Sequence, residues 1–300
     1  MKFVTYNIQW SKGKDGRLDL ARIARAVDGA DVICLQEVES GWRRTGNADQ
    51  SLALAALLPR YYWVYGPGYD LEASIARPDG TIEHRRRRFG NMTLARGPIL
   101  STRTLPLRKI DVRKLGSMHT AAVEAVVRIG AATFRVYNVH LDDVLQRERL
   151  LQIEDLYRYV FAAPVEGGAH TGHRDPADPF ADEDWSNGEA DPPMPRPAVL
   201  MGDFNLDPAW AEYDAMVGPR DVQRGRVVTP DRFVDAMLAA GHPEDCGATW
   251  YPGPQEPELR PLRLDYCFVT HDLAGAVRKA WIDQDADGSD HQPVWTEIEL

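Results

Sequence analysis

The sequence predicts a mixed α/β (α+β) fold in which helices pack over β-sheets. Short β-rich runs recur along the chain, and helical patterns stand between them. A composition of 44% hydrophobic and 9% aromatic residues is typical of a chain that buries a substantial core. We find no internal repeat and no linker between two self-sufficient halves, so residues 1–300 are predicted to form a single domain.

The β-rich runs are the expected strands, and three further segments are the expected helices. The strands are 3–6, 32–35, 92–94, 121–127, 134–139, 198–201 and 266–269. The helices are 18–27, 147–161 and 229–240. Apolar residues recur at helical spacing in the first two. The third begins with Thr229 and Pro230 and is followed by Gly241, which are residues that helix starts and ends prefer.

Two segments interrupt this pattern. Residues 163–197 are crowded with Pro, Gly, Asp and Glu, which predicts a long loop or insertion and not a second core. Residues 66–88 end in a basic run, Arg85 to Arg88, beside the strand at 92–94. One interpretation of this run is an edge hairpin protected by its charge. The other is a contact with a phosphate or a polyanion.

Charge and composition restrict the classes of function. A formal charge of −10 argues against tight non-specific binding of nucleic acid, although a bound cation or a local basic patch leaves a nuclease open. No apolar run is long enough to span a bilayer, and the first residues lack the features of a secretory signal. Three unpaired cysteines suit a reducing environment. The expected compartment is the cytoplasm.

Ligand-type side chains follow four of the expected strands. Asn7, Glu37, His140 and Asp203 stand at the carboxyl ends of their apolar runs. Because ligands bind at that end of open α/β sheets, these residues are expected to share one rim. Each has an ordinary structural interpretation when taken alone, such as a turn residue or a solvated carboxylate. Their recurrence predicts a polar cleft.

The motifs around these positions resemble those of the endonuclease/exonuclease/phosphatase (DNase I-like) family. They are Thr5-Tyr6-Asn7-Ile8, Leu35-Gln36-Glu37-Val38, Gly90-Asn91, Asn138-Val139-His140-Leu141, Gly202-Asp203-Phe204-Asn205, Arg263-Leu264-Asp265-Tyr266 and Ser289-Asp290-His291-Gln292-Pro293. The blocks occur in the family's order and span residues 5–293. The resemblance implies a four-layer sandwich, with two mixed β-sheets face to face and helices outside.

The resemblance also implies a set of site residues. The implied metal ligands are Glu37, Asn7 and Asp290, and hard oxygen donors of this kind suit Mg²⁺ or Mn²⁺. The implied catalytic residues are His140, Asp203, Asn205, Asp265 and His291. The expected substrate contacts are Asn91 and Arg263 of these motifs, and Arg88 of the basic run.

Each catalytic residue has an implied role. Asp203 would orient or deprotonate the attacking water, and Asn205 would hold that water or a phosphate oxygen. His291 would stabilise charge on the scissile phosphate, with Asp265 fixing its ring. A second imidazole at His140 would bind phosphate or protonate the leaving oxygen.

His140 also separates branches of the family. The abasic-site endonuclease branch typically has Tyr-Val-Pro at this block, where this chain has Val139-His140-Leu141, so we disfavour base-excision repair. Arg149 and Gln152 on the following helix resemble the bacterial metal-dependent hydrolase branch.

Three functions remain in competition. The first is a divalent-metal-dependent phosphodiesterase or phosphatase that acts on a small or lipid-derived phosphate ester, and the acidity of the chain favours it. The second is a DNase- or RNase-like nuclease. The third is a catalytically inactive binding module on the same fold, which the intact set of motifs disfavours. No protein partner is evident from the sequence.

Overall fold

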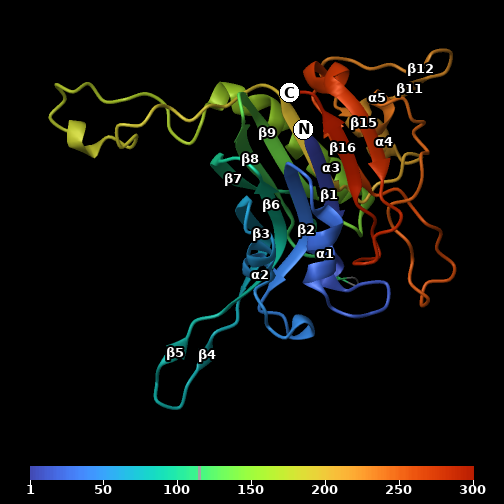
Figure 1. Cartoon of the computed structure of the whole chain (residues 1–300), viewed down its shortest axis with the longest axis horizontal. Helices are drawn as coiled ribbons and strands as arrows, with labels where there is room; N and C mark the ends of the chain where they lie inside the picture. Colours follow the sequence, from blue (N-terminus) through green and yellow to red (C-terminus); the bar gives the residue numbers. More distant parts are fainter. Residues whose placement is uncertain (114–115) are drawn as a thin grey trace.

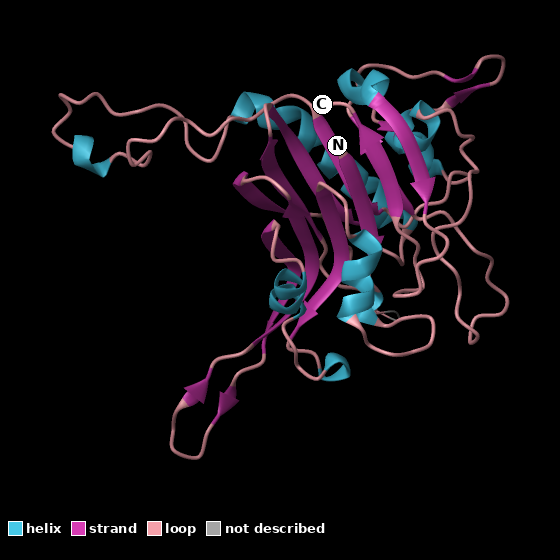
Figure 2. Ribbon diagram, viewed as in Figure 1, coloured by secondary structure: helices cyan, strands magenta, loops and turns pink. Residues whose placement is uncertain are grey.

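The computed structural model, described for residues 1–113 and 116–300, contains two large sheets packed face to face with helices outside them (Figures 1 and 2). The first sheet has the order β15 (Val277–Ile282), β16 (Val294–Ile298), β1 (Lys2–Asn7), β2 (Val32–Ser40), β6 (Arg86–Ala95), β3 (Tyr62–Glu72). The second has the order β13 (Val234–Asp235), β14 (Asp265–Val269), β10 (Ala198–Asp203), β9 (Ala132–His140), β8 (Ala121–Ile129), β7 (Ile99–Pro106). Every expected strand is therefore present.

The same pairing pattern occurs at the centre of both sheets. In the first sheet β1 pairs in parallel with β2, and these strands are flanked by antiparallel β16 and β6. In the second, β9 pairs in parallel with β10, and β8 and β14 flank them antiparallel. Each sheet thus places the carboxyl ends of two adjacent strands at one edge, which is the arrangement expected for the ligand-type residues.

Three apolar clusters fill the three interfaces between the four layers. The cluster between the sheets joins Phe3 and Cys34 of the first sheet to Phe134 and Met201 of the second. A second cluster packs α3 (Gln146–Glu166) and α4 (Ala211–Val217) on the outer face of the second sheet. A third packs α1 (Leu20–Val27) and α2 (Gln50–Leu57) on the outer face of the first sheet. The four-layer sandwich that the resemblance implied is confirmed.

The helices agree with the sequence at two of three places. They are α1 (Leu20–Val27), α2 (Gln50–Leu57), α3 (Gln146–Glu166), α4 (Ala211–Val217) and α5 (Ala236–Ala239). The expected helices at 18–27 and 147–161 are α1 and α3. Asp19 caps α1 by accepting hydrogen bonds from the amides of Ala21 and Arg22. In the described part of the chain, no helix combines the length and the apolar character that crossing a bilayer requires.

The helix expected at 229–240 is wrong over its first half. Residues 234–235 form β13, paired with β14, and α5 covers only Ala236–Ala239. Asp235 is fully buried, and it caps α5 and binds the guanidinium of Arg263. These long-range partners override the local signals at Thr229 and Pro230.

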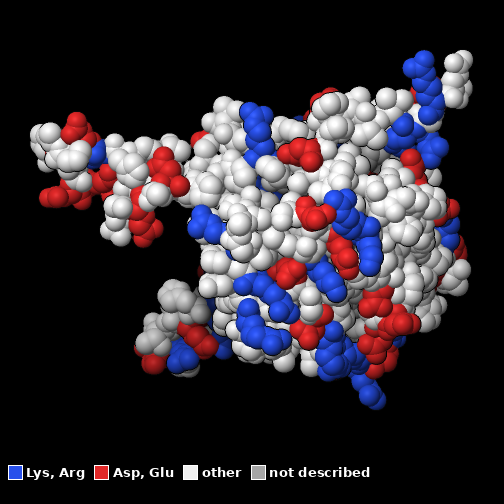
Figure 3. Space-filling model, turned by 45° about the horizontal axis from the view of Figure 1, so that its top comes forward, with Lys and Arg blue, Asp and Glu red and all other residues white. Residues whose placement is uncertain are grey.

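Two segments project from the sandwich. Residues 167–197 form an arm whose regular structure is one short 3₁₀ turn, Ala181–Glu183, and Figure 3 shows acidic side chains along it. The strands β4 (Ile75–Ala76) and β5 (Ile82–Glu83) form a hairpin that extends away from the layers (Figure 1). A smaller pair, β11 (Arg220–Asp221) and β12 (Gly225–Arg226), lies near α4. The insertion expected at 163–197 therefore begins four residues later, where α3 ends.

Gly202 allows the close approach of the two central strands of the second sheet. A Cβ at this position would collide with the carbonyl oxygen of Val139 on β9. We expect Gly202→Ala to lower the free energy of unfolding by about 3 kcal/mol, because β9 and β10 must move apart. Urea unfolding measures this loss. Gly275→Ala is the control, because that position is exposed with no atom near its added Cβ; an equal loss in both variants would contradict the steric explanation.

Candidate active site

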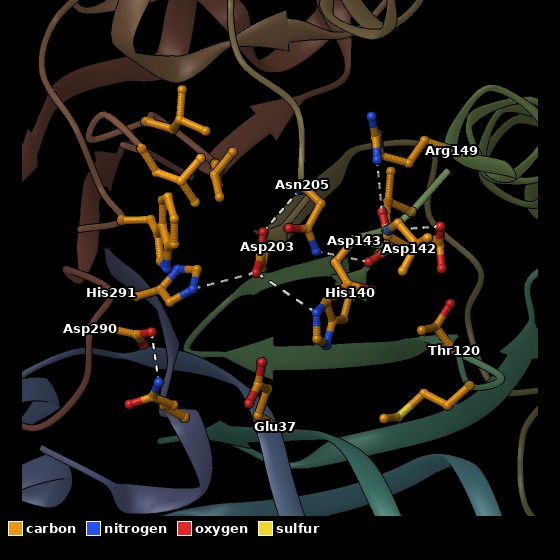
Figure 4. A pocket seen from close by; sticks show the side chains of 18 of the residues that line it. Glu37, Thr120, His140, Asp142, Asp143, Arg149, Asp203, Asn205, Asp290 and His291 are labelled. Atoms are coloured by element: carbon orange, nitrogen blue, oxygen red, sulfur yellow. Dashed lines mark hydrogen bonds and ion pairs between the residues drawn. The ribbon is translucent and has the colours of Figure 1, made fainter. Parts of the chain in front are cut away.

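Three strand ends and one position inside a fourth strand bring polar side chains together at one edge of the sandwich. Asn7 ends β1, His140 ends β9 and Asp203 ends β10, while Glu37 lies within β2. Figure 4 shows Glu37, His140 and Asp203 facing a common space. Asn7 joins the two sheets there, because its side-chain amide donates to Glu37 Oε1 at 3.0 Å and to Asp203 Oδ2 at 2.9 Å.

A β-bulge turns Glu37 into this space. Leu35 pairs with Met92 and Val38 with Gly90, so two residues of β2 stand opposite the single residue Asn91 of β6. Glu37 has φ +60°, a left-handed conformation that is unfavourable for a residue with a Cβ. Such strain persists only where surrounding contacts fix it, and it concentrates at functional sites.

Buried amides hold the bulge between the sheets. The Asn138 amide donates to the carbonyls of Leu35 and Met92, and the Gln36 amide donates to Asn138 Oδ1 at 2.8 Å. Asn91 donates to the carbonyls of Ala121 and Asn138. These bonds satisfy strand carbonyls that would otherwise be buried without partners. Asn91, an expected substrate contact, is instead 2% exposed and joins the sheets.

The second sheet positions the carboxylate and amide of its Gly-Asp-Phe-Asn motif through local bonds. Asp203 Oδ1 accepts from the backbone amide of Asn205 at 2.9 Å. The Asn205 side chain donates to the Leu141 carbonyl at 3.0 Å, and its backbone φ is +50°. Asp203 Oδ2 is left facing the cavity, beside the side chains that converge there.

Two imidazoles flank Asp203. His140 Nε2 lies 3.7 Å and His291 Nε2 lies 3.8 Å from Asp203 Oδ2 (Figure 4). His291 Nδ1 is 2.8 Å from Asp265 Oδ2. The Asp265 amide donates to Thr249 Oγ1 at 3.0 Å, which fixes the start of β14. The ring of His291 is thereby oriented by a buried carboxylate, in the way that catalytic imidazoles are commonly oriented.

The electrostatic surroundings give the two imidazoles different protonation states. Burial disfavours charge on His291, but the carboxylates of Asp265 and Asp203 outweigh it and raise the pKa of His291 to about 10. Burial lowers the pKa of His140, despite the opposing charge of Glu37. At neutral pH, His291 is therefore the cationic ring and His140 the neutral one.

Burial also raises the pKa values of the carboxyls. It raises the pKa of Glu37, and together with the charge of Asp265 it raises the pKa of Asp203 to about 7. A carboxyl that titrates near neutral pH is well matched to accepting a proton from water.

A cavity of about 910 Å³ opens over this cluster. The expected site residues that line it are Glu37, His140, Asp203, Asn205, Asp290 and His291. Asn7 and Asp265 lie behind the cavity wall, where they are hydrogen-bonded to the lining residues Glu37 and His291. Asp290 Oδ2 accepts from the side chain of Gln9 at 2.7 Å.

The other two expected substrate contacts, Arg88 and Arg263, are also outside the cavity. Arg88 lies on β6 with its Nε 3.5 Å from Asp70 of β3, and Arg86 pairs with the same carboxylate at 2.8 Å. The basic run is thus balanced by acids of the neighbouring strand, which favours the edge-hairpin interpretation. Arg263 is 3% exposed and pairs with Asp235 at 2.8 Å, so its motif position serves the core.

Other lining residues were not anticipated as site residues. Trp10, Arg44 and Phe89 lie together at one end of the cavity, and Met118, Trp210 and Trp250 also line it. No local pattern marks Trp10 or Arg44, because they reach the cavity from two 3₁₀ segments, Gln9–Ser11 and Arg43–Thr45, not from strand ends.

Comparison with known proteins agrees with this geometry. The model of the Endonuclease/Exonuclease/phosphatase family matches residues 4–291. The chain belongs to this family. Endonuclease/exonuclease/phosphatase proteins include phosphatases and nucleases, so the chain is a hydrolytic enzyme of this class. Among curated proteins, none gives a significant match.

Solved structures share the endonuclease/exonuclease/phosphatase fold over the whole chain. A family protein from Bacteroides vulgatus is 18% identical, with TM-score 0.64 over 100% of this chain and 98% of that one. A mannosyl-6-phosphatase from Bacteroides thetaiotaomicron is 16% identical, with TM-score 0.60 over 100% of both chains. A Neisseria 3′ phosphatase bound to a product DNA hairpin is 17% identical, with TM-score 0.54 over 100% of both. Because these identities are only 16–18%, the matches show that the fold is shared.

Proposed function

We propose that this chain is a divalent-metal-dependent hydrolase of phosphate esters that uses water activated at Asp203. The observation that carries the proposal is the convergence of Asp203 with two imidazoles at the floor of one cavity. Phosphoryl transfer needs a positioned nucleophile, charge neutralisation and a proton for the leaving oxygen. We assign side chains of the site to these tasks.

The side chains fit a hard divalent cation. Glu37 is a half-buried carboxylate at the cavity floor that accepts a hydrogen bond from the neutral amide of Asn7, and Asp290 lines the same cavity. These oxygen donors suit Mg²⁺ or Mn²⁺, and the cation would neutralise charge on the phosphoryl oxygens. Donor atoms of Asp203, Asp265 and His291 also lie within 4.8 Å of one another. We place the cation at Glu37 because Mg²⁺ and Mn²⁺ prefer carboxylate oxygens to an imidazole nitrogen.

The remaining residues take complementary roles. Asp203 accepts the proton of the attacking water, and Asn205 holds that water or a phosphate oxygen. The cationic ring of His291, oriented by Asp265, stabilises charge on the phosphoryl group. His140, the neutral ring, donates a hydrogen bond to a second phosphoryl oxygen, and the cationic His291 is the ring that can protonate the leaving oxygen.

The lining favours a small phosphate ester over an extended nucleic acid. Seven carboxylate side chains line the cavity, and three arginines do. All three are paired with acids: Arg44, Arg149 and Arg260 lie 2.6 Å, 2.7 Å and 3.6 Å from carboxylates of Glu39, Glu212 and Asp207. Binding of an extended nucleic acid usually relies on many contacts between its phosphates and Lys or Arg side chains, and this cavity offers few. A nuclease is the alternative, and comparing substrates distinguishes the two.

The test compares the protein with Mg²⁺ or Mn²⁺ and after EDTA treatment. We expect hydrolysis of bis-p-nitrophenyl phosphate or p-nitrophenyl phosphate with metal and none without it. Glu37→Gln should lower kcat about 10³-fold, because the principal oxygen donor loses its charge. Glu72→Gln, an exposed change of the same kind on β3, is the control.

Single-stranded DNA, duplex DNA, RNA and small phosphomonoesters are assayed beside the synthetic esters. Faster turnover of a nucleic acid would replace the small-ester proposal with the nuclease. Undiminished turnover in EDTA, or in Glu37→Gln, would contradict metal dependence through this residue. An inactive wild-type protein on every substrate, with metal present, would favour the binding module.

A further inference from the structure

One end of the cavity is built differently from the catalytic floor. Arg44 lies there with its guanidinium carbon 3.8 Å from the ring centre of Trp10 and 4.6 Å from that of Trp42. Both Trp10 and Arg44 line the cavity. A guanidinium between two indole rings has little freedom to turn, so its hydrogen-bonding edges keep fixed directions.

A buried carboxylate fixes one edge of this guanidinium. Nε and Nη2 of Arg44 donate to Glu39 Oε2 at 2.8 Å and 2.6 Å. The other oxygen of Glu39, which is fully buried, accepts from the hydroxyl of Thr45 at 2.5 Å. Within residues 1–113 and 116–300, Nη1 of Arg44 has no acceptor. The arginine is thus held along one edge and open along another.

The backbone that carries Trp10 is strained. Gln9, Trp10 and Ser11 have φ of +41°, +48° and +72°, three successive left-handed residues that each have a Cβ. This conformation is sterically unfavourable, and a run of three is unusual. It places Gln9 on Asp290 and Trp10 against Arg44. Strain retained at a cavity wall is a mark of a functional arrangement.

One buried side chain connects this turn to the support of Arg44. The amide of Gln50, which is 1% exposed, donates to the Trp10 carbonyl at 2.8 Å and to Ser11 Oγ at 3.2 Å. Its carbonyl oxygen accepts from the backbone amide of Glu39 at 3.1 Å. The wall that bears Trp10 and the carboxylate that holds Arg44 are therefore positioned by the same residue, which preorganises the pair.

A second cation lies close to Arg44. Lys12 Nζ lies 5.7 Å from the ring centre of Trp10, on an exposed side chain. Arg44 and Lys12 thus both approach the same indole. Glu39 offsets the charge of Arg44, so an anion here would be held mainly by directed hydrogen bonds from the guanidinium.

We propose that Arg44, stacked between Trp10 and Trp42, binds a second anionic group of the substrate, one that is not cleaved. The inference rests on the proposed hydrolysis of phosphate esters and narrows its substrate class to small molecules that carry two anionic groups. The fork of a guanidinium matches the oxygens of a phosphate or a carboxylate, and a preorganised fork loses little freedom on binding.

The test measures inhibition of bis-p-nitrophenyl phosphate hydrolysis, so the added compounds need not be turned over. Fructose 1,6-bisphosphate is compared with fructose 6-phosphate, and 3-phosphoglycerate with glycerol 3-phosphate. Each pair differs by one anionic group, a phosphate in the first and a carboxylate in the second. We expect the compound with two anionic groups in at least one pair to inhibit about tenfold more strongly than its partner with one. The pair that shows this difference tells whether Arg44 binds a phosphate or a carboxylate.

Arg44→Gln should remove this preference by raising the inhibition constant of the doubly anionic compound about tenfold or more. The constants for the singly anionic compounds, and the KM for bis-p-nitrophenyl phosphate, should change less than twofold. Arg43→Gln is the matched control, because Arg43 is the neighbouring arginine, exposed like Arg44 and with the same charge, but does not line the cavity. Arg44→Lys, which keeps the charge but not the planar fork, should give an intermediate constant.

Equal inhibition within both pairs by the wild-type protein would overturn the proposal, and so would equal effects of Arg43→Gln and Arg44→Gln. Thermal unfolding of each variant establishes that it is folded. If the wild-type protein hydrolyses no ester, the proposed function fails, and isothermal titration with the same four compounds still decides whether Arg44 binds a second anion.

Discussion

His291→Ala is expected to lower kcat for phosphate-ester hydrolysis about 10³-fold while the protein remains folded. The ring is the one imidazole of the site whose pKa is raised, to about 10, so its removal deletes a cation aimed at the reacting phosphoryl group. Steady-state kinetics with bis-p-nitrophenyl phosphate and metal measure the loss. His242→Ala removes an exposed imidazole away from the cavity and is the control.

Asp265 acts through His291, and a double variant separates this role from direct catalysis. Asp265→Asn should itself lower kcat. It should add little to the loss caused by His291→Ala, because both changes disable the same hydrogen-bonded pair of Asp265 and His291. Full additivity of the two losses would show that Asp265 acts independently of the ring. Wild-type turnover in His291→Ala would refute the assigned role of the imidazole.

Arg263→Met is expected to lower the free energy of unfolding by about 3–5 kcal/mol without raising KM on any substrate. The guanidinium is 3% exposed and binds Asp235, which is fully buried, so its removal leaves an uncompensated carboxylate inside the second sheet. Urea unfolding provides the measurement. Arg278→Met breaks the pair with Glu299 at the surface and should cost less than about 1 kcal/mol.

A second change tests whether the lost stability comes from the unpaired acid. Replacing Asp235 by Asn in the Arg263→Met background removes that charge and should restore part of the stability. A stable Arg263→Met protein with a raised KM would instead return Arg263 to the substrate contacts that the resemblance implied.

The strands at the site were predictable because their signals are local. Apolar runs ending in Asn7, His140 and Asp203 require no knowledge of the rest of the chain, and all three runs are strands. The bulge at Glu37 was not predictable, since it depends on pairing with Gly90 and Met92 of a strand distant in the sequence. Its side chain nevertheless reaches the expected rim.

The failures involve residues whose partners are far apart in the sequence. Arg263 belongs to a site motif, but its guanidinium forms a buried ion pair with Asp235 in the core. Asp235 also takes part in a strand where Thr229 and Pro230 suggested a helix. Trp10 and Arg44 carry no pattern of their own, and only the contact between η1 (Gln9–Ser11) and η2 (Arg43–Thr45) makes them a pair.

The position of β16 has a consequence for the order in which activity can arise during synthesis. Of the strands in this sheet β1 is synthesised before the others, yet one of its two neighbours is β16, which ends at Ile298. Asp290 and His291 lie just before that strand. A nascent chain that has not reached this region leaves one edge of β1 without its partner strand and lacks two residues of the cavity. The enzyme can therefore begin to turn over substrate only after residues 290–298 have been translated.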